Sequence, residues 1–192
     1  MKRKIYAQLI DWKSQAHRKP LILNGVRQCG KTYILKKFGQ EAFDNLAYVS
    51  CDRNENLQAI YAGDFDTTRI IRGLSALTGE DIIPGKTLIF LDEVQAFPQA
   101  LEALKYFCED APEYHIVVAG SLLGVALHAG VSFPVGKVQT MRLYPMDFEE
   151  FLMAMGEDQL IKLMRSRIMA DECLTRKAER LFAPILLRGR DA

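Results

Sequence analysis

The fold of this chain follows from the stretch Gly25-Val26-Arg27-Gln28-Cys29-Gly30-Lys31-Thr32. It fits the pattern Gly, four residues, Gly-Lys-Thr, which is typical of a phosphate-binding loop. A short apolar run, Pro20–Asn24, precedes it, and Tyr33–Phe38 has the composition of a helix. A strand that enters such a loop and a helix that leaves it direct backbone N–H groups and the helix N-terminus at phosphate oxygens. The context therefore favours nucleotide binding over a fortuitous glycine-rich turn.

Length and composition are those of an ordinary globular protein. The chain has 192 residues, of which 49% are hydrophobic and 26% charged, and its net charge is +1. This length is enough for one α/β domain with a buried core. This balance shows no broad electrostatic footprint for nucleic acid or a membrane surface. The four cysteines form no Cys-x-x-Cys pair, so we expect neither a zinc site nor a disulfide framework. No run reaches the length of a membrane span, and we expect a cytoplasmic protein.

Strand-like and helix-like segments alternate along the chain. Continuous apolar runs at 87–91 and 115–119 indicate strands buried on both faces of a sheet. The alternation predicts an α/β fold with a mostly parallel five-stranded sheet and helices on both faces. We expect strands at 21–24, 46–51, 87–91, 115–119 and 137–143, the last at a sheet edge, and helices at 4–15, 33–38, 67–78, 98–110 and 148–155.

Two regions are expected. Residues 1–156 would form the nucleotide-binding domain, and residues 157–192 a helical, basic C-terminal tail. Asp66 and Asp147 are expected to cap the helices that follow them. The basic residues of the tail most simply form a solvated surface, and a nucleic-acid contact is the weaker alternative.

The loop residues suggest roles in binding triphosphate. Backbone N–H groups would form the cradle, and Lys31 would reach the β- and γ-phosphates as a compact charge. The Thr32 hydroxyl would ligate Mg²⁺. The expected nucleotide-binding residues are Gly25, Val26, Arg27, Gln28, Cys29, Gly30, Lys31, Thr32 and Tyr33.

A second motif comes at Leu88-Ile89-Phe90-Leu91-Asp92-Glu93. Four apolar residues followed by two acids resemble the Walker B element of AAA-type P-loop ATPases. The strand would place both acids at the sheet edge where ligands bind. Asp92 would hold Mg²⁺ through water, and Glu93 would act as general base on the attacking water. The alternative is a pair of solvated acids at a strand end.

Other candidates are less specific. In AAA-type folds a polar residue after the next strand senses the γ-phosphate, and Ser121 holds that position, although Gly-Ser is also an ordinary turn. Gln95 would contact the water or lie on the surface. The absence of an Asn-Lys-x-Asp element favours adenine over guanine. An arginine finger could come from a partner or from Arg27, Arg69, Arg72 or Arg142.

Several segments in order resemble a prokaryotic group of AAA-family ATPases with an N-terminal ATP-binding domain and a C-terminal domain of unknown function. The segments are 18–23, the phosphate loop, 88–95, 114–123, 132–137 and 143–151. The resemblance covers residues 1–165 and implies ATP and Mg²⁺ as ligands and ATP hydrolysis as the activity. We expect the C-terminal domain to be missing here. Many relatives have Gly-Arg where this chain has Gly136-Lys137, which would slow hydrolysis if that side chain serves the nucleotide.

Four functions stay open at this stage. The first is an ATPase that couples hydrolysis to a conformational change. The others are a nucleotide-binding switch with little hydrolysis, a small-molecule kinase and a nucleic-acid-linked motor. A protein partner or a homo-oligomer would fit this class, and the sequence identifies neither.

Overall fold

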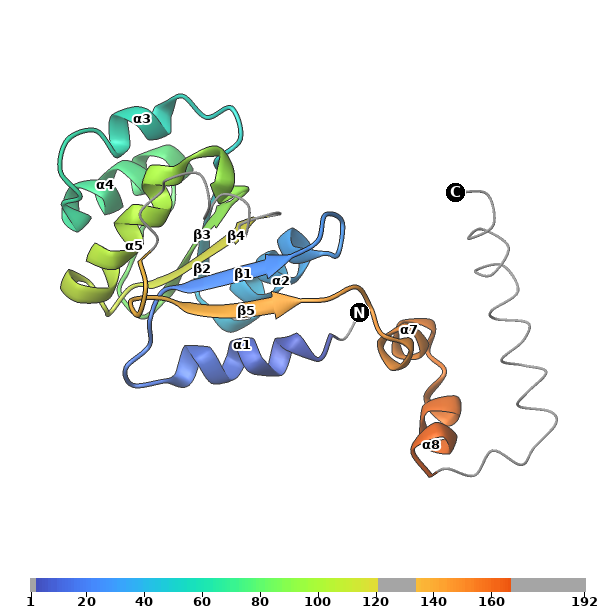
Figure 1. Cartoon of the computed structure of the whole chain (residues 1–192). Helices are drawn as coiled ribbons and strands as arrows, with labels where there is room; N and C mark the ends of the chain where they lie inside the picture. The colour runs from blue at the N-terminus through green and yellow to red at the C-terminus, as the bar shows by residue number, and fades with distance from the viewer. Residues whose placement is uncertain (1–2, 121–133, 167–192) are drawn as a thin grey trace. The chain divides into compact units, whose positions relative to one another are not determined.

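A β-sheet with helices packed against it forms most of the described structure (Figure 1). The computed structural model describes residues 3–120 and 134–166. They belong to two units, of which the first is Arg3–Pro145 and the second begins at Met146. The helix at 148–155 lies in the second unit.

The first unit holds a five-stranded sheet in the order β2-β3-β4-β1-β5. Every neighbouring pair of strands is parallel, and β5 lies at an edge as predicted. β3 and β4 are buried along their whole length, which explains their unbroken apolar sequences. The strands are β1 (Leu21–Gly25), β2 (Asn45–Ser50), β3 (Thr87–Asp92), β4 (His115–Gly120) and β5 (Gln139–Leu143).

Helices cover both faces of the sheet (Figure 1). On one face α1 and α2 pack around Trp12 and Phe38, and on the other α3, α4 and α5 pack around Leu74 and Phe107. This confirms the predicted layers. The helices of the first unit are α1 (Ile5–Ser14), α2 (Lys31–Ala42), α3 (Asn56–Ile60), α4 (Thr67–Thr78), a 3₁₀ turn η1 (Val94–Ala96) and α5 (Pro98–Asp110).

Local chemistry sets the helix ends. The Asp66 side chain accepts a 2.6 Å hydrogen bond from the Arg69 N–H at the start of α4, and Gly79 ends that helix in the left-handed region. In the second unit, Asp147 and Glu150 form a capping box at the start of α7 (Phe148–Met155). A further helix, α8 (Asp158–Ser166), follows it.

Strand register brings the two sequence motifs to one edge. Asn24 pairs with Gly120 on β4, and Leu91 on β3 pairs with Val118 two residues earlier on β4. Asp92 and Glu93 therefore lie at the carboxyl edge from which the phosphate loop leaves β1. In open parallel sheets this edge is where ligands bind.

Candidate functional site

The phosphate loop joins β1 to α2 through an unusual backbone. Gln28 has φ 62° and Gly30 has φ 94°, so the chain twice enters the left-handed region before the helix begins. A Cβ on Gly25 would lie 2.5 Å from the backbone oxygen of Leu143 and 2.9 Å from Sγ of Cys29. Only glycine fits at the first loop position, because the β5 backbone and the loop itself occupy that space.

Lys31 points back into the loop that precedes it. Its Nζ donates hydrogen bonds of 2.9 Å to the backbone oxygens of Gly25 and Val26. The side chain is 6% exposed, so the ammonium is held at the mouth of the loop rather than in bulk water. The structure thus places a positive charge at the loop, and a lysine at this position is part of the phosphate-binding loop pattern.

Asp92 and Glu93 leave the end of β3 in different environments. Asp92 is 4% exposed, and its carboxylate accepts from the Glu93 N–H at 3.0 Å and from the Tyr48 hydroxyl at 3.4 Å. Glu93 has φ 51°, and its Oε2 accepts from the side-chain amide of Gln95. The left-handed turn at Glu93 thus separates a buried acid from a partly exposed one.

The acids also affect nearby ionisable groups. Burial and then the charges of Asp92 and Glu93 raise the pKa of the Cys51 thiol to about 12. Burial and then Asp92 raise the pKa of the Tyr48 hydroxyl. Both groups stay protonated at neutral pH, and Tyr48 therefore remains a donor to Asp92.

A pocket of about 690 Å³ opens beside these groups, a size typical of small-molecule sites. The phosphate loop and the start of α2 form one side, and the segment after β3 forms the other. Its lining residues are Arg27, Gln28, Gly30, Lys31, Thr32, Tyr33, Asp52, Glu93, Gln95 and Ala96.

Most of the predicted site residues therefore meet in one place. Gly25, Val26, Cys29 and Asp92 do not line the pocket. Cys29 and Asp92 are buried, and Gly25 begins the loop at the end of β1. Ser121 lies outside the described residues.

The oxygen atoms of Thr32 and Asp92 fit a magnesium site in which phosphate oxygens supply further ligands. Mg²⁺ prefers oxygen ligands and is usually held by one or two carboxylates, waters and substrate phosphates. Thr32 offers a hydroxyl at the pocket, and Asp92 a carboxylate behind it. Within the described ranges, no three His, Cys, Asp or Glu side chains gather as a metal site by themselves. Protein atoms alone would thus hold the ion incompletely.

The arginine candidates have different surroundings. Arg27 lines the pocket. Arg69 donates a 2.6 Å hydrogen bond to the Ile60 backbone oxygen and pairs with Asp64, so its guanidinium ties α3 to α4.

Lys137 is ion-paired with Glu109 at 2.8 Å and precedes Gln139, which pairs with Leu21 at the start of β1. Lys137 therefore lies toward the amino ends of the strands, whereas the phosphate loop leaves the carboxyl end of β1.

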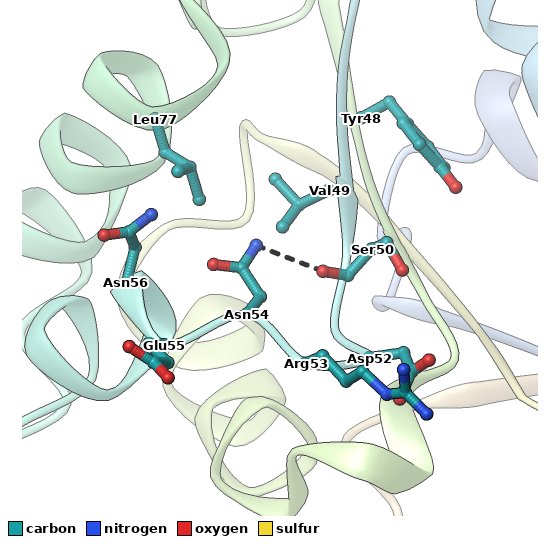
Figure 2. Close-up of a pocket in the computed structure, with 9 residues that line it drawn as sticks. All are labelled: Tyr48, Val49, Ser50, Asp52, Arg53, Asn54, Glu55, Asn56 and Leu77. Atoms are coloured by element: carbon teal, nitrogen blue, oxygen red, sulfur yellow. Dashed lines mark hydrogen bonds between the residues drawn. The ribbon is translucent and has the colours of Figure 1, made fainter.

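Sequence reasoning assigned no role to Asp52 or Tyr48. Asp52 follows β2 and lines the nucleotide-sized pocket as well as a second pocket of about 500 Å³. In the second pocket the Asn54 amide donates a 3.1 Å hydrogen bond to the Ser50 backbone oxygen (Figure 2). The rule that ligands meet strand ends would have singled out Asp52, as it singled out Asp92.

Comparison with known proteins agrees with this geometry. The model of a family described as AAA domain matches residues 17–152. The chain belongs to this family. The match spans β1, the phosphate loop and the acids after β3, so the AAA domain contains every described element of the pocket. No curated protein gives a significant match to the chain.

Membership of this family indicates the fold of the domain and the class of ligand that it binds. The α/β architecture is that of a P-loop NTPase of the AAA type, as predicted. The family indicates nucleotide binding and, at the level of the family, an enzyme of the ATPase type. In the described part of the chain, no helix has both the length and the apolar character needed to cross a bilayer.

Proposed function

We propose that this AAA domain binds ATP with Mg²⁺ and hydrolyses it to ADP and phosphate, coupling the cycle to a conformational change. One observation carries the proposal: Lys31, which follows β1, and Glu93, which follows β3, line the same pocket. ATP hydrolysis at such a site uses a cation that binds the phosphates and a carboxylate that orients the attacking water.

Each residue has a defined task in this reaction. Backbone N–H groups of the loop hold the phosphates, and Lys31 exchanges its bonds to Gly25 and Val26 for bonds to phosphate oxygens. Thr32 and Asp92 would hold Mg²⁺, which supplies charge neutralisation when bound. The water oxygen attacks the γ-phosphorus while Glu93 accepts the proton, and the bond to the ADP oxygen breaks.

Gln95 would act through Glu93. Its amide donates to Oε2 of Glu93, which fixes the orientation of the carboxylate and leaves Oε1 for the water. Adenine specificity, a cytoplasmic location and the 1–156 domain boundary stay predictions.

Phosphate release by the purified chain with ATP and Mg²⁺ tests the proposal. Glu93→Gln should lower kcat by about 100-fold or more, because positioned general bases contribute about 10²- to 10⁴-fold, while ADP affinity stays within about threefold. Glu113→Gln is the matched control, since Glu113 is exposed before β4 and away from the pocket. Unchanged turnover in Glu93→Gln would refute the role of Glu93.

The same assay separates the other functions. Tight ATP binding without phosphate release would identify a nucleotide switch. Formation of ADP that requires an alcohol acceptor, without release of inorganic phosphate, would identify a kinase. Stimulation by DNA would support a nucleic-acid-linked motor, and the mass in solution during turnover would reveal a homo-oligomer.

A further inference from the structure

Arg3 lies directly against the phosphate loop although it precedes the first helix. Its side chain is buried, with the whole residue 7% exposed. Nη1 donates a 3.1 Å hydrogen bond to the backbone oxygen of Cys29, and Nη2 donates a 2.7 Å hydrogen bond to the backbone oxygen of Tyr144. The guanidinium thus bridges the loop and the segment that follows β5.

We propose that Arg3 is a positioning residue of the phosphate site, which holds the Cys29–Gly30 peptide with its N–H directed at bound phosphate. This inference rests on the nucleotide binding proposed above. The oxygen of Cys29 and the N–H of Gly30 belong to one peptide group. Anchoring the oxygen on one side fixes the direction of the N–H on the other.

The charge of Arg3 strengthens that N–H as a donor. A guanidinium is always protonated in proteins, and its hydrogen bonds to carbonyls are charge-assisted. A hydrogen bond to a peptide oxygen polarises the peptide and increases the partial positive charge on its N–H. A Cβ on Gly30 would lie 3.8 Å from Nη1 of Arg3, so the cation itself lies close to the loop.

Burial gives this cation a further reason to favour an anion in the loop. The attraction between two charges is stronger where little water lies between them. Polyphosphate bound beside Gly30 would bring negative charge close to this guanidinium. Arg3 should therefore increase affinity for nucleotides whose phosphates occupy the loop, with or without Mg²⁺.

Arg18 provides a matched control. It also donates to two backbone oxygens, those of Pro112 at 2.8 Å and Tyr114 at 3.4 Å. Those residues precede β4, at the edge of the sheet opposite to the phosphate loop. Replacing Arg18 removes a similar clamp without touching the phosphate site.

The test measures the Kd of a fluorescent ADP analogue, with Mg²⁺ and with EDTA, for the full chain. Arg3→Met should weaken binding by about 10-fold or more in both buffers, and Arg3→Lys by less, because lysine keeps the charge but loses the fork. Arg18→Met should stay within twofold of wild type. In turnover assays Arg3→Met should raise KM for ATP and leave kcat within about threefold, since Glu93 and Gln95 are not contacted.

Three results would overturn the inference. The first is an unchanged Kd in a folded Arg3→Met protein. The second is an equal loss in Arg18→Met, which would mean that general destabilisation is the cause. If Arg3→Met does not fold, the test uses Arg3→Lys instead. The third result is then an unchanged Kd for ADP in Arg3→Lys. If the wild-type protein does not bind ADP, both the proposed function and the role of Arg3 are wrong. If the wild type binds ADP and the Arg3 variant binds it equally well, only the role of Arg3 is wrong.

Discussion

The hydroxyl of Tyr48 on β2 donates a 3.4 Å hydrogen bond to Oδ2 of Asp92 at the end of β3. The Tyr48 ring also contacts two other side chains: its centroid lies 5.3 Å from that of Phe90 and 3.5 Å from Nζ of Lys36. A fixed aromatic ring therefore presents a single donor to the acid that we assign to Mg²⁺.

Tyr48→Phe should weaken the response to Mg²⁺. The variant keeps the ring and removes the donor, so Asp92 loses part of its orientation. Partners of metal ligands are typically worth about 10- to 100-fold in metal affinity, and the long 3.4 Å bond places this case at about three- to tenfold. The measurement is the Mg²⁺ concentration that gives half-maximal ATP turnover. Tyr106→Phe, whose ring stacks on Phe65, is the control, and equal Mg²⁺ requirements in all three proteins would contradict the assignment.

Gly25→Ala should damage the loop more than the fold. The new methyl group would meet the Leu143 backbone oxygen at 2.5 Å, and overpacking of this kind costs about 1–3 kcal/mol. Gly85→Ala costs a similar amount, about 1–2 kcal/mol, through its φ of 74° in open space. We expect both to lower the urea midpoint and only Gly25→Ala to weaken ADP binding. Equal ADP affinity in the two variants would argue against the tight packing of Gly25 as a requirement of the site.

Lys31→Met should abolish stabilisation by nucleotide. A ligand at 100 times its Kd stabilises a protein by about 2.7 kcal/mol, which appears as a higher Tm with ADP. Without the ammonium the phosphates lose their main side-chain cation, and the shift should vanish. Lys37→Met on the same helix removes only an exposed pair with Glu41 and should keep it. A normal ADP shift in Lys31→Met would show that nucleotide binds elsewhere.

Acid should destabilise the domain through His115. Its imidazole packs against the rings of Trp12 and Phe43, and burial, followed by the charge of Arg18, lowers its pKa from 6.5 to about 4. Between these values the unfolded chain binds more protons than the folded one, so stability falls as pH drops through this window. At about 1.4 kcal/mol per pKa unit the loss is about 3 kcal/mol.

Urea unfolding at pH 7 and pH 4.5 measures this effect. His115→Phe should lose less stability than wild type between the two pH values, because the variant has no imidazole to protonate. His17→Gln changes an exposed histidine and should follow wild type. The explanation would be wrong if His115→Phe had the same pH dependence as wild type.

Segments governed by local chemistry could be predicted from the sequence. Asp66 caps α4, and α5 begins at Pro98 and ends before Pro112, because capping groups and proline act on their immediate neighbours. The buried strands were predictable from their apolar runs, and their parallel order follows from the alternation of strand and helix.

Long-range contacts were not predictable in this way. Arg3 forms hydrogen bonds with Cys29, 26 positions away along the chain, and with Tyr144, 141 positions away. Tyr48 forms a hydrogen bond with Asp92, 44 positions away. In the sequence, Arg3 is one of several basic residues at the N-terminus, and nothing there distinguishes a buried guanidinium from a solvated one. The register of β2 and β3 places Tyr48 near Asp92, and the packing of the N-terminal segment places Arg3 at the loop, neither of which single-sequence patterns contain.

The position of β5 determines where the rest of the chain is attached. Leu143 is level with Gly25, so the polypeptide that continues beyond Pro145 departs from the edge of the sheet that holds the phosphate loop. The tether begins one strand away from the phosphate loop, because β5 pairs directly with β1. In the ATP cycle proposed above, a movement of the loop would therefore act on this tether through a single pair of neighbouring strands.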